Sequence, residues 1–293
     1  MRVLVTGANG FLGRNVALAL LERGFEVTGF DLQADLPLPI RWERGDICDL
    51  SQIRHAATGH DAICHIAAVG DVYLATENPP LAAAVNVTGS ANVAEAAMAN
   101  GCKVVYASTW EVYGDPKYEP IDERHPTEPD HPYSITKLAG ERILLAANRL
   151  RGVPVIALRL GTAYGPGLRT NSVFSLFIDR ARRGEPIEIQ GDGSQSRQFT
   201  HASDLARAFF LACQTDVQGV ALNVVAPDQV SIKELAELVI RRLPTEIAYT
   251  EARAGDVSSA IVSSEAIRDT LGWEPRVGFE AGLNDLIDSL SPG

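Results

Sequence analysis

Short apolar runs alternate with helical stretches over the first half of the chain. The strand-like runs fall at 2–7, 25–31, 61–68, 102–108 and 154–160, and the helical stretches at 10–24, 86–100 and 133–150. Most of the runs are apolar at consecutive positions, so both faces of these strands are expected to be covered. Such strands alternating with helices predict an α/β fold, a doubly wound parallel (Rossmann) sheet with right-handed crossovers.

The pattern of predicted elements changes after Tyr164-Gly165-Pro166-Gly167: the helices and strands become shorter, and turn residues become more frequent. This change predicts a second, smaller C-terminal α/β lobe, joined tightly because no Ser-rich or Pro-rich linker precedes it. We expect a Rossmann domain of residues 1–165 plus about 198–225, and a smaller lobe of 166–197 plus about 226–293.

The composition of the chain restricts the classes of binding partner that can be expected. The chain has 293 residues, 46% of them hydrophobic, and a net charge of −11 without a basic run. Nucleic acid and anionic membranes need a positive footprint, so neither is an expected partner. Anionic small molecules stay possible, because local Arg side chains or a helix N-terminus can hold them.

The apolar runs, histidines and cysteines of the sequence predict a cytoplasmic protein that binds no metal. No signal peptide and no run of 18 apolar residues is visible, which predicts a cytoplasmic location and no membrane span. The six histidines show no metal-ligand spacing. The four cysteines show no CxxC pair and are expected to be buried thiols in a reducing compartment; they are Cys48, Cys64, Cys102 and Cys213.

The stretch "TGANGFLG" (6–13) predicts a dinucleotide site. It places Gly7, Gly10 and Gly13 after the first strand and at the start of a helix. Glycines there allow a tight turn and close approach of a pyrophosphate, which the helix N-terminus attracts. Asp31 ends the second strand, where a carboxylate accepts both ribose hydroxyls of NAD and repels the 2′-phosphate of NADP.

Further cofactor contacts are expected around this turn. Asp46 and Ile47 could border the adenine, and Ala67 and Ala68 could let the cofactor pass close to a strand end. His65 is more simply a structural histidine than a catalyst. Within the glycine stretch itself, the other candidate contacts are Asn9, Phe11 and Leu12.

A basic tyrosine is predicted in "PYSITKLAGE" (132–141). Tyr133 and Lys137 are four residues apart, which places them on one face of a helix. Tyrosine is a poor base at neutral pH, but a nearby ammonium favours the phenolate. The same Lys can bond the nicotinamide ribose. Between the two motifs, "VVYASTWEVYG" (104–114) ends a strand with hydroxyls, and is either a frayed strand end or an active-site wall.

Taken in order, these motifs resemble the extended short-chain dehydrogenase/reductase family, and within it the NAD-dependent epimerase/dehydratase group acting on nucleotide sugars. The pattern includes "STWEVYG", YxxxK, RxxxxYGP, GDGxQxR and "LGWEP". The resemblance implies NAD as cofactor. It also implies that Thr109 hydrogen-bonds the reacting hydroxyl while Tyr133 removes its proton and hydride passes to NAD. Lys137 would hold Tyr133 in its reactive form, and Asn86 would support that geometry.

The residues after Thr109 separate members of the group. In the related sugar 4,6-dehydratases this stretch is Thr-Asp-Glu, and the Asp protonates the departing hydroxyl; Trp110 cannot deliver that proton. Trp110 is expected either to shape the sugar pocket or to pack against the adjacent lobe. Glu111 is a candidate catalytic residue, because UDP-glucuronate decarboxylases resemble "STxEVYGDP".

The second lobe carries the expected nucleotide-sugar contacts. By resemblance, Arg197 in "GDGSQSRQF" and Arg253 would hold the diphosphate, a role suited to a guanidinium. Two departures affect substrate placement: Gln198 stands where the family has Asp, and Thr162 where it has Asn. The helices at 86–100 and 133–150 would form the homodimer interface of the family, or else simply cover the sheet.

We therefore predict an NAD-dependent 4-epimerase of a UDP-hexose or UDP-uronate. It would oxidise C4 transiently, let the 4-keto sugar turn over, and return the hydride. The alternatives are a UDP-glucuronate decarboxylase, a sugar dehydrogenase or keto-sugar reductase, and a non-catalytic dinucleotide sensor on the same fold.

Overall fold

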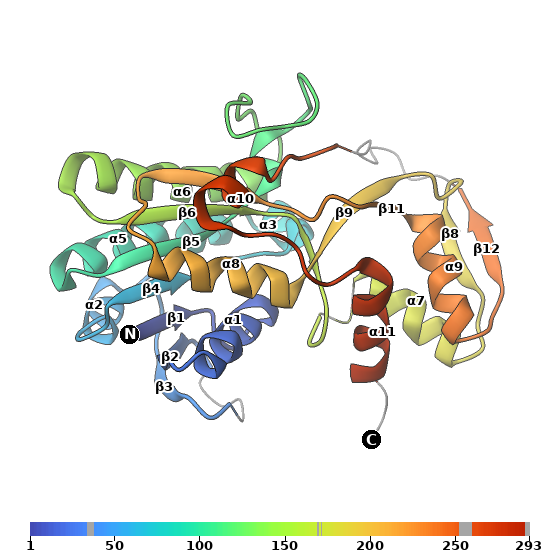
Figure 1. Cartoon of the computed structure of the whole chain (residues 1–293), viewed down its shortest axis with the longest axis horizontal. Coiled ribbons are helices and arrows are strands. Elements are labelled where there is room, and N and C mark those ends of the chain that lie inside the picture. Colours follow the sequence, from blue (N-terminus) through green and yellow to red (C-terminus); the bar gives the residue numbers. More distant parts are fainter. Residues whose placement is uncertain (34–37, 169, 171, 252–259, 291–293) are drawn as a thin grey trace.

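The larger part of the protein is built on one seven-stranded sheet (Figure 1). The computed structural model describes residues 1–33, 38–168, 170, 172–251 and 260–290. All neighbouring strands of this sheet are parallel. In spatial order the strands are β10 (Val220–Val224), β6 (Val155–Leu160), β5 (Lys103–Thr109), β4 (Ala62–His65), β1 (Arg2–Thr6), β2 (Glu26–Asp31) and β3 (Arg41–Arg44).

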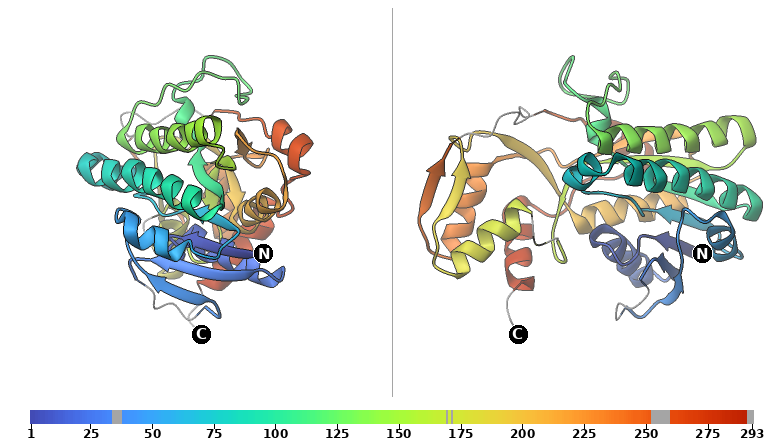
Figure 2. Two further views of the ribbon diagram at one scale, coloured as in Figure 1. Left: turned by 90° about the vertical axis from the view of Figure 1, so that its left-hand side faces the viewer. Right: turned by 180° about the vertical axis from the view of Figure 1, so that it is seen from behind.

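Helices cover both faces of the sheet, which confirms the predicted doubly wound fold (Figure 2). One face packs against α1 (Phe11–Glu22), α8 (Ala202–Gln214) and α10 (Glu265–Leu271). The other face packs against α2 (Leu50–Ala56), α5 (Gly89–Asn100) and α6 (Pro132–Arg151). The short segments α3 (Val72–Glu77), α4 (Pro79–Ala82) and the π-helix η1 (Ala83–Thr88) lead into α5.

Two local differences from the sequence expectations have physical reasons. The apolar pattern does not predict the edge strand β3, because its sequence, "RWER", carries no apolar run; backbone pairing with β2 makes it a strand. The helix expected to begin at Asn86 is preceded by α4 and η1, so the chain is already helical at Pro79. Proline suits the first turn of a helix because its missing N–H has no partner there anyway.

The smaller C-terminal lobe is present as predicted. The buried Phe174 and Phe177 lie in its core. Its sheets comprise β7 (Thr162–Tyr164), β9 (Ser196–His201) and β11 (Gln229–Ser231), and separately β8 (Ile187–Gln190) with β12 (Ile247–Thr250). Its helices are α7 (Val173–Arg182), α9 (Ile232–Arg242) and α11 (Phe279–Ser289). The residue boundaries between the two parts stay a prediction.

The order of the strands fixes where a ligand can bind. The sequence order runs outward in opposite directions from β1 and β4, so the crevice lies beyond the carboxyl ends of these strands. Four of the strands end at this edge, with Thr6, Asp31, His65 and Thr109 as their last residues.

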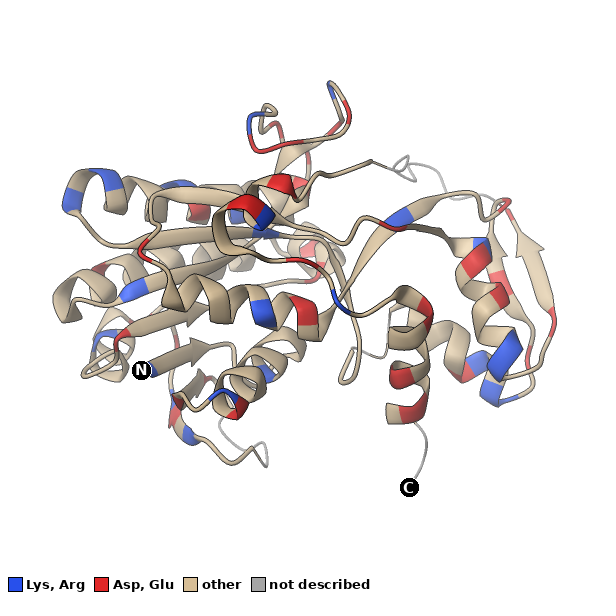
Figure 3. Cartoon of the chain, viewed as in Figure 1, with Lys and Arg blue, Asp and Glu red and all other residues tan. Residues whose placement is uncertain are grey.

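Acidic and basic residues are interspersed over the helices of both lobes (Figure 3). Among the described residues, no helix is both long enough and apolar enough to cross a bilayer.

Candidate active site

The glycine turn between β1 and α1 is shaped by close backbone contacts. Gly7 has a φ of +71°, and a Cβ placed on it would lie 2.7 Å from the backbone of Ala67. A Cβ on Gly13 would lie 2.0 Å from the carbonyl oxygen of Gly7. Gly10 is the N-cap of α1, so no side chain shields the N–H groups of the first turn. The turn therefore leaves a bare helix N-terminus that fits a pyrophosphate.

Asp31 and Asn9 complete this turn. The Asp31 carboxylate accepts the backbone N–H of Asn9 (3.0 Å) and of Gln33 (3.3 Å), which places it beside the glycines. The Asn9 side-chain oxygen is buried and has no hydrogen-bond partner among the described residues. A buried acceptor left open beside a helix N-terminus is a feature that a bound ligand would satisfy. These observations fit a dinucleotide at the position the sequence predicted.

The other predicted cofactor residues lie at the start of α1 and in the segments that follow β3 and β4. Phe11 and Leu12 form the first turn of α1, next to Gly10. Ile47 is buried against Gly89 of α5, and Asp46 accepts the N–H of Cys48 (2.8 Å). Ala67 donates its N–H to the Thr6 hydroxyl (3.2 Å), and Ala68 follows it, partly exposed.

Asn86 and His65 use their polar atoms inside the protein. The Asn86 amide oxygen accepts the N–H of Val69 (2.8 Å), and its nitrogen donates to the Thr136 hydroxyl (3.0 Å). It thereby ties the segment after β4 to α6. His65 lies between the Thr6 and Ser90 hydroxyls, and burial, reinforced by the charge of Lys137, lowers its pKa to about 3. A neutral His65 with a hydrogen bond at each ring nitrogen fits the structural role expected for it.

Thr109 and Lys137 lie on two elements that pack together, β5 and α6. Lys137 is only 3% exposed, and its Nζ lies 4.3 Å from the centre of the Tyr106 ring. Burial lowers the pKa of Lys137 to about 7, with the charge of Glu141 opposing the shift. Tyr133, one turn earlier on α6, contacts an apolar cluster around Val69. The helix that carries the predicted tyrosine and lysine thus packs against the strand that Thr109 ends.

A buried ion pair that the sequence did not reveal supports this region. Both Arg159 (6% exposed side chain) and Glu141 (0%) are buried, at an N–O distance of 2.6 Å. The same carboxylate accepts the Ser108 hydroxyl (2.5 Å), and Arg159 donates to the Tyr113 hydroxyl (2.8 Å). Ser108 adjoins Thr109, so this network fixes the end of β5. The one sequence feature that pointed to a buried charge here is Glu141 itself, which lies one turn after Lys137 on the same helix face.

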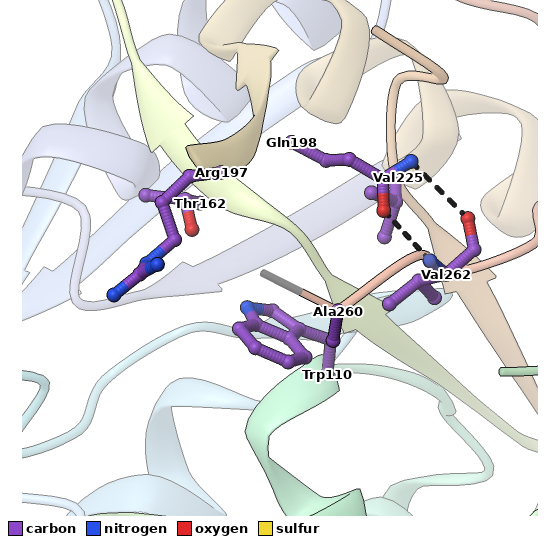
Figure 4. Close-up of a pocket in the computed structure, with 7 residues that line it drawn as sticks. All are labelled: Trp110, Thr162, Arg197, Gln198, Val225, Ala260 and Val262. Carbon is purple, nitrogen blue, oxygen red and sulfur yellow. Dashed lines mark hydrogen bonds between the residues drawn. The ribbon is translucent and has the colours of Figure 1, made fainter. Parts of the chain in front are cut away.

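Trp110, Thr162 and Arg197 line a pocket between the two lobes (Figure 4). Trp110 belongs to the short 3₁₀ helix η2 (Trp110–Tyr113) and also packs against the buried Ala260 and Val262. It therefore lines this pocket and also packs against a buried cluster; its place at a sugar stays a prediction. Arg197 donates to the Ser196 carbonyl (2.8 Å), and Thr162 begins β7. Arg253 falls outside the described residues.

Gln198 is engaged with the backbone around this pocket. Its oxygen accepts the N–H of Val262 (2.7 Å), and its nitrogen donates to the Ala226 carbonyl (3.0 Å) and toward the Val262 carbonyl (3.4 Å; Figure 4). The side chain is buried. This departure from the Asp of the resembled pattern therefore ties β9 to the segment around Val262.

The chain matches known proteins over most of its length. Residues 3–225 match the model of the NAD dependent epimerase/dehydratase family. A dTDP-glucose 4,6-dehydratase of Streptomyces niveus is 30% identical, over 98% of this chain and 92% of the relative. A UDP-glucose 4-epimerase of Mycolicibacterium smegmatis is 30% identical (98% of each chain). A UDP-N-acetyl-alpha-D-glucosaminuronate decarboxylase of Bacillus cytotoxicus is 29% identical (98% and 96%).

Solved structures agree with this pattern. MoeE5 in complex with UDP-glucuronic acid and NAD is 34% identical, with a TM-score of 0.91, and the match covers 99% of this chain and 98% of MoeE5. The relatives share a fold and differ in the reactions their names state.

Proposed function

Because the chain belongs to the NAD dependent epimerase/dehydratase family, we propose that it is a 4-epimerase of a nucleotide sugar, a UDP-hexose or UDP-uronate. The family match confirms the resemblance seen in the motifs, and the family's description confirms NAD as its cofactor. NAD would lie along the glycine turn, with Asp31 at its ribose, and supplies a hydride acceptor that also returns the hydride. Retained cofactor makes the reaction redox-neutral.

In this proposal Tyr133 takes the proton of the sugar hydroxyl, which Thr109 holds by a hydrogen bond. The partly protonated Lys137 favours the phenolate. Proton transfer of this kind contributes roughly 10²- to 10⁴-fold to a rate. The observation that supports the proposal is the packing of α6 against β5, because these two elements carry the three residues.

Trp110 weighs against a dehydratase, despite the Streptomyces relative. Dehydration needs an acid that delivers a proton to the leaving hydroxyl, and an indole N–H cannot serve as one at neutral pH. The indole instead lines the pocket wall. Without that acid, the 4-keto sugar would turn over in the site and take the hydride back on its other face, which is epimerisation.

Decarboxylation of a UDP-uronate is a second candidate, favoured by Glu111 and by the decarboxylase relative. Oxidation at C4 would make a β-keto acid that loses carbon dioxide. The pocket and the proton-transfer trio serve both reactions equally, so the product decides between them.

The test is to incubate purified protein with UDP-glucose, UDP-galactose and UDP-glucuronate without added NAD, and to resolve the products by chromatography with mass detection. A new isomer of unchanged mass supports the epimerase. Loss of about 44 mass units, one carbon dioxide, from the uronate supports the decarboxylase. Tyr133→Phe is the matched control, and it should abolish turnover and spare NAD binding. Turnover by Tyr133→Phe would overturn the mechanism.

The homodimer also stays a prediction. Met98 on α5, and Ile135 and Leu150 on α6, are 40%, 48% and 73% exposed, which leaves apolar groups on the outer side of both helices. Light scattering after size exclusion would give the mass in solution. A monomer at micromolar concentration would contradict the prediction.

A further inference from the structure

His131 connects the turn after β5 to the start of α6. Its Nε2 lies 3.0 Å from the Glu111 carboxylate. It is also the N-cap of α6, and its Nδ1 lies 3.4 Å from the backbone nitrogen of Ser134. In return the Ser134 hydroxyl donates to the His131 carbonyl (3.0 Å). One side chain therefore joins the segment directly after Thr109 to the start of the helix that carries Tyr133 and Lys137.

The two ring nitrogens of His131 have different tasks. Since Nδ1 faces an N–H donor, it acts as an acceptor, and in the neutral ring the proton lies on Nε2. That proton points at Glu111, which as a carboxylate can only accept. The hydrogen bond to Glu111 raises the pKa of His131, against the effect of burial, and Asp130 adds to the rise. Charge and hydrogen bonding thus favour the same contact.

The His131 ring also lies along the Tyr133 ring. The planes are inclined by only 10°, and the ring centres are 6.1 Å apart. Tyr133 further contacts the apolar cluster of Val69, Ala75 and Ala82. At the other end of the chain of contacts, the Glu111 N–H is donated to the Thr109 hydroxyl (3.3 Å). Three successive contacts therefore connect Thr109 to Glu111, Glu111 to His131, and His131 to Tyr133.

We propose that His131 is a positioning residue that fixes Glu111 and, through this clamp, the placement of Tyr133 relative to Thr109. This inference rests on the proposed function, in which Tyr133 and Thr109 act on one hydroxyl. A purely stabilising role would be small, because both members of the His131–Glu111 pair are about 30% exposed and such pairs contribute little to folding. Misplacing a reacting group by about 1 Å, in contrast, lowers a rate by up to about 100-fold.

Three variants separate the two contacts of His131. His131→Gln keeps a donor that reaches Glu111, whereas His131→Asn keeps a good N-cap but is too short for Glu111. We expect His131→Asn to lower kcat roughly 10- to 100-fold, with KM and Tm nearly unchanged, and His131→Gln to restore most of kcat. The double variant, Glu111→Gln with His131→Asn, should lower kcat little more than the single substitution with the larger effect, because the two residues act through one contact. Wild-type kcat in His131→Asn, or losses that multiply, would overturn the proposal.

A second measurement needs no substrate. The His131 and Tyr133 ring signals are followed by NMR in the intact protein and its variants. The His131 pKa should fall in Glu111→Gln, and the Tyr133 ring signals should shift in His131→Asn and return in His131→Gln. Unchanged signals in these variants would refute the clamp, whatever the protein turns over. A clamp present in a protein that converts no nucleotide sugar would refute the proposed function alone.

Discussion

Replacing Glu141 by Gln tests whether the buried network under the active site supports the fold. The carboxylate is fully buried and takes three hydrogen bonds, from the Ser108 hydroxyl (2.5 Å) and from Nη2 (2.6 Å) and Nε (3.2 Å) of Arg159. Gln has nearly the same size, but its amide nitrogen turns a donor toward donors. Arg159 would keep its charge in the interior without the carboxylate that pairs with it directly.

The expected cost is about 3–5 kcal/mol of the free energy of unfolding, the usual loss when one member of a buried ion pair is removed. In urea this corresponds to a fall of roughly 1 M or more in the unfolding midpoint. The change should also reach the active site, since Glu141 opposes the lowering of the Lys137 pKa. Without that carboxylate the pKa of Lys137 should fall further.

Urea unfolding followed by circular dichroism measures the cost, and Glu95→Gln is the matched control. Glu95 also pairs with an arginine, Arg151, but these side chains are 36% and 42% exposed. Solvent screens such a pair, so the control should stay close to wild type. If Glu141→Gln unfolds at the same urea concentration as Glu95→Gln, the buried pair contributes no more to stability than the exposed one, and the burial reasoning is wrong.

Three further variants probe the site. Lys137→Met should abolish turnover yet raise the free energy of unfolding at pH 7 by on the order of 4 kcal/mol, because the folded protein binds the lysine proton only below about pH 7. The gain should shrink as pH rises toward 10, so equal gains at pH 7 and 10 in urea titrations would contradict the burial argument. Gln198→Leu leaves the Val262 N–H without its acceptor, which should cost about 1–3 kcal/mol and lower Tm; an unchanged Tm would show that this contact is dispensable. Asp31→Ala should weaken NAD binding roughly 10-fold or more, and calorimetry showing wild-type affinity would remove Asp31 from the cofactor site.

Sequence patterns predicted the features that depend on neighbours along the chain. The spacing of Gly7 and Gly13 after the first strand indicated a tight βα turn, and Asp31 was recognised by its place at the end of the second strand. Tyr133 and Lys137 share a helix face because four residues make about one turn. The parallel sheet and the smaller lobe followed from the alternation of elements.

Contacts between distant segments could not be predicted in the same way. Glu141 meets Arg159 because α6 packs on β6, and His131 meets Glu111 because the helix start packs on the end of β5. Neither pair has a fixed spacing that a sequence could display. Gln198 looked like a changed substrate contact, whereas its amide binds backbone groups that come close only in the folded chain.

The glycines of the first turn have a consequence for how related sequences diverge. Side chains at positions 7 and 13 would collide with the protein's own backbone, at 2.7 and 2.0 Å, whether or not a ligand is ever bound. At position 10 the nearest atom to such a side chain is 3.2 Å away, a much milder conflict. A descendant that lost its cofactor would therefore keep the first and third glycines under selection for folding alone. The residue at position 10 would drift more readily, and it is the better record of whether a relative still binds a dinucleotide.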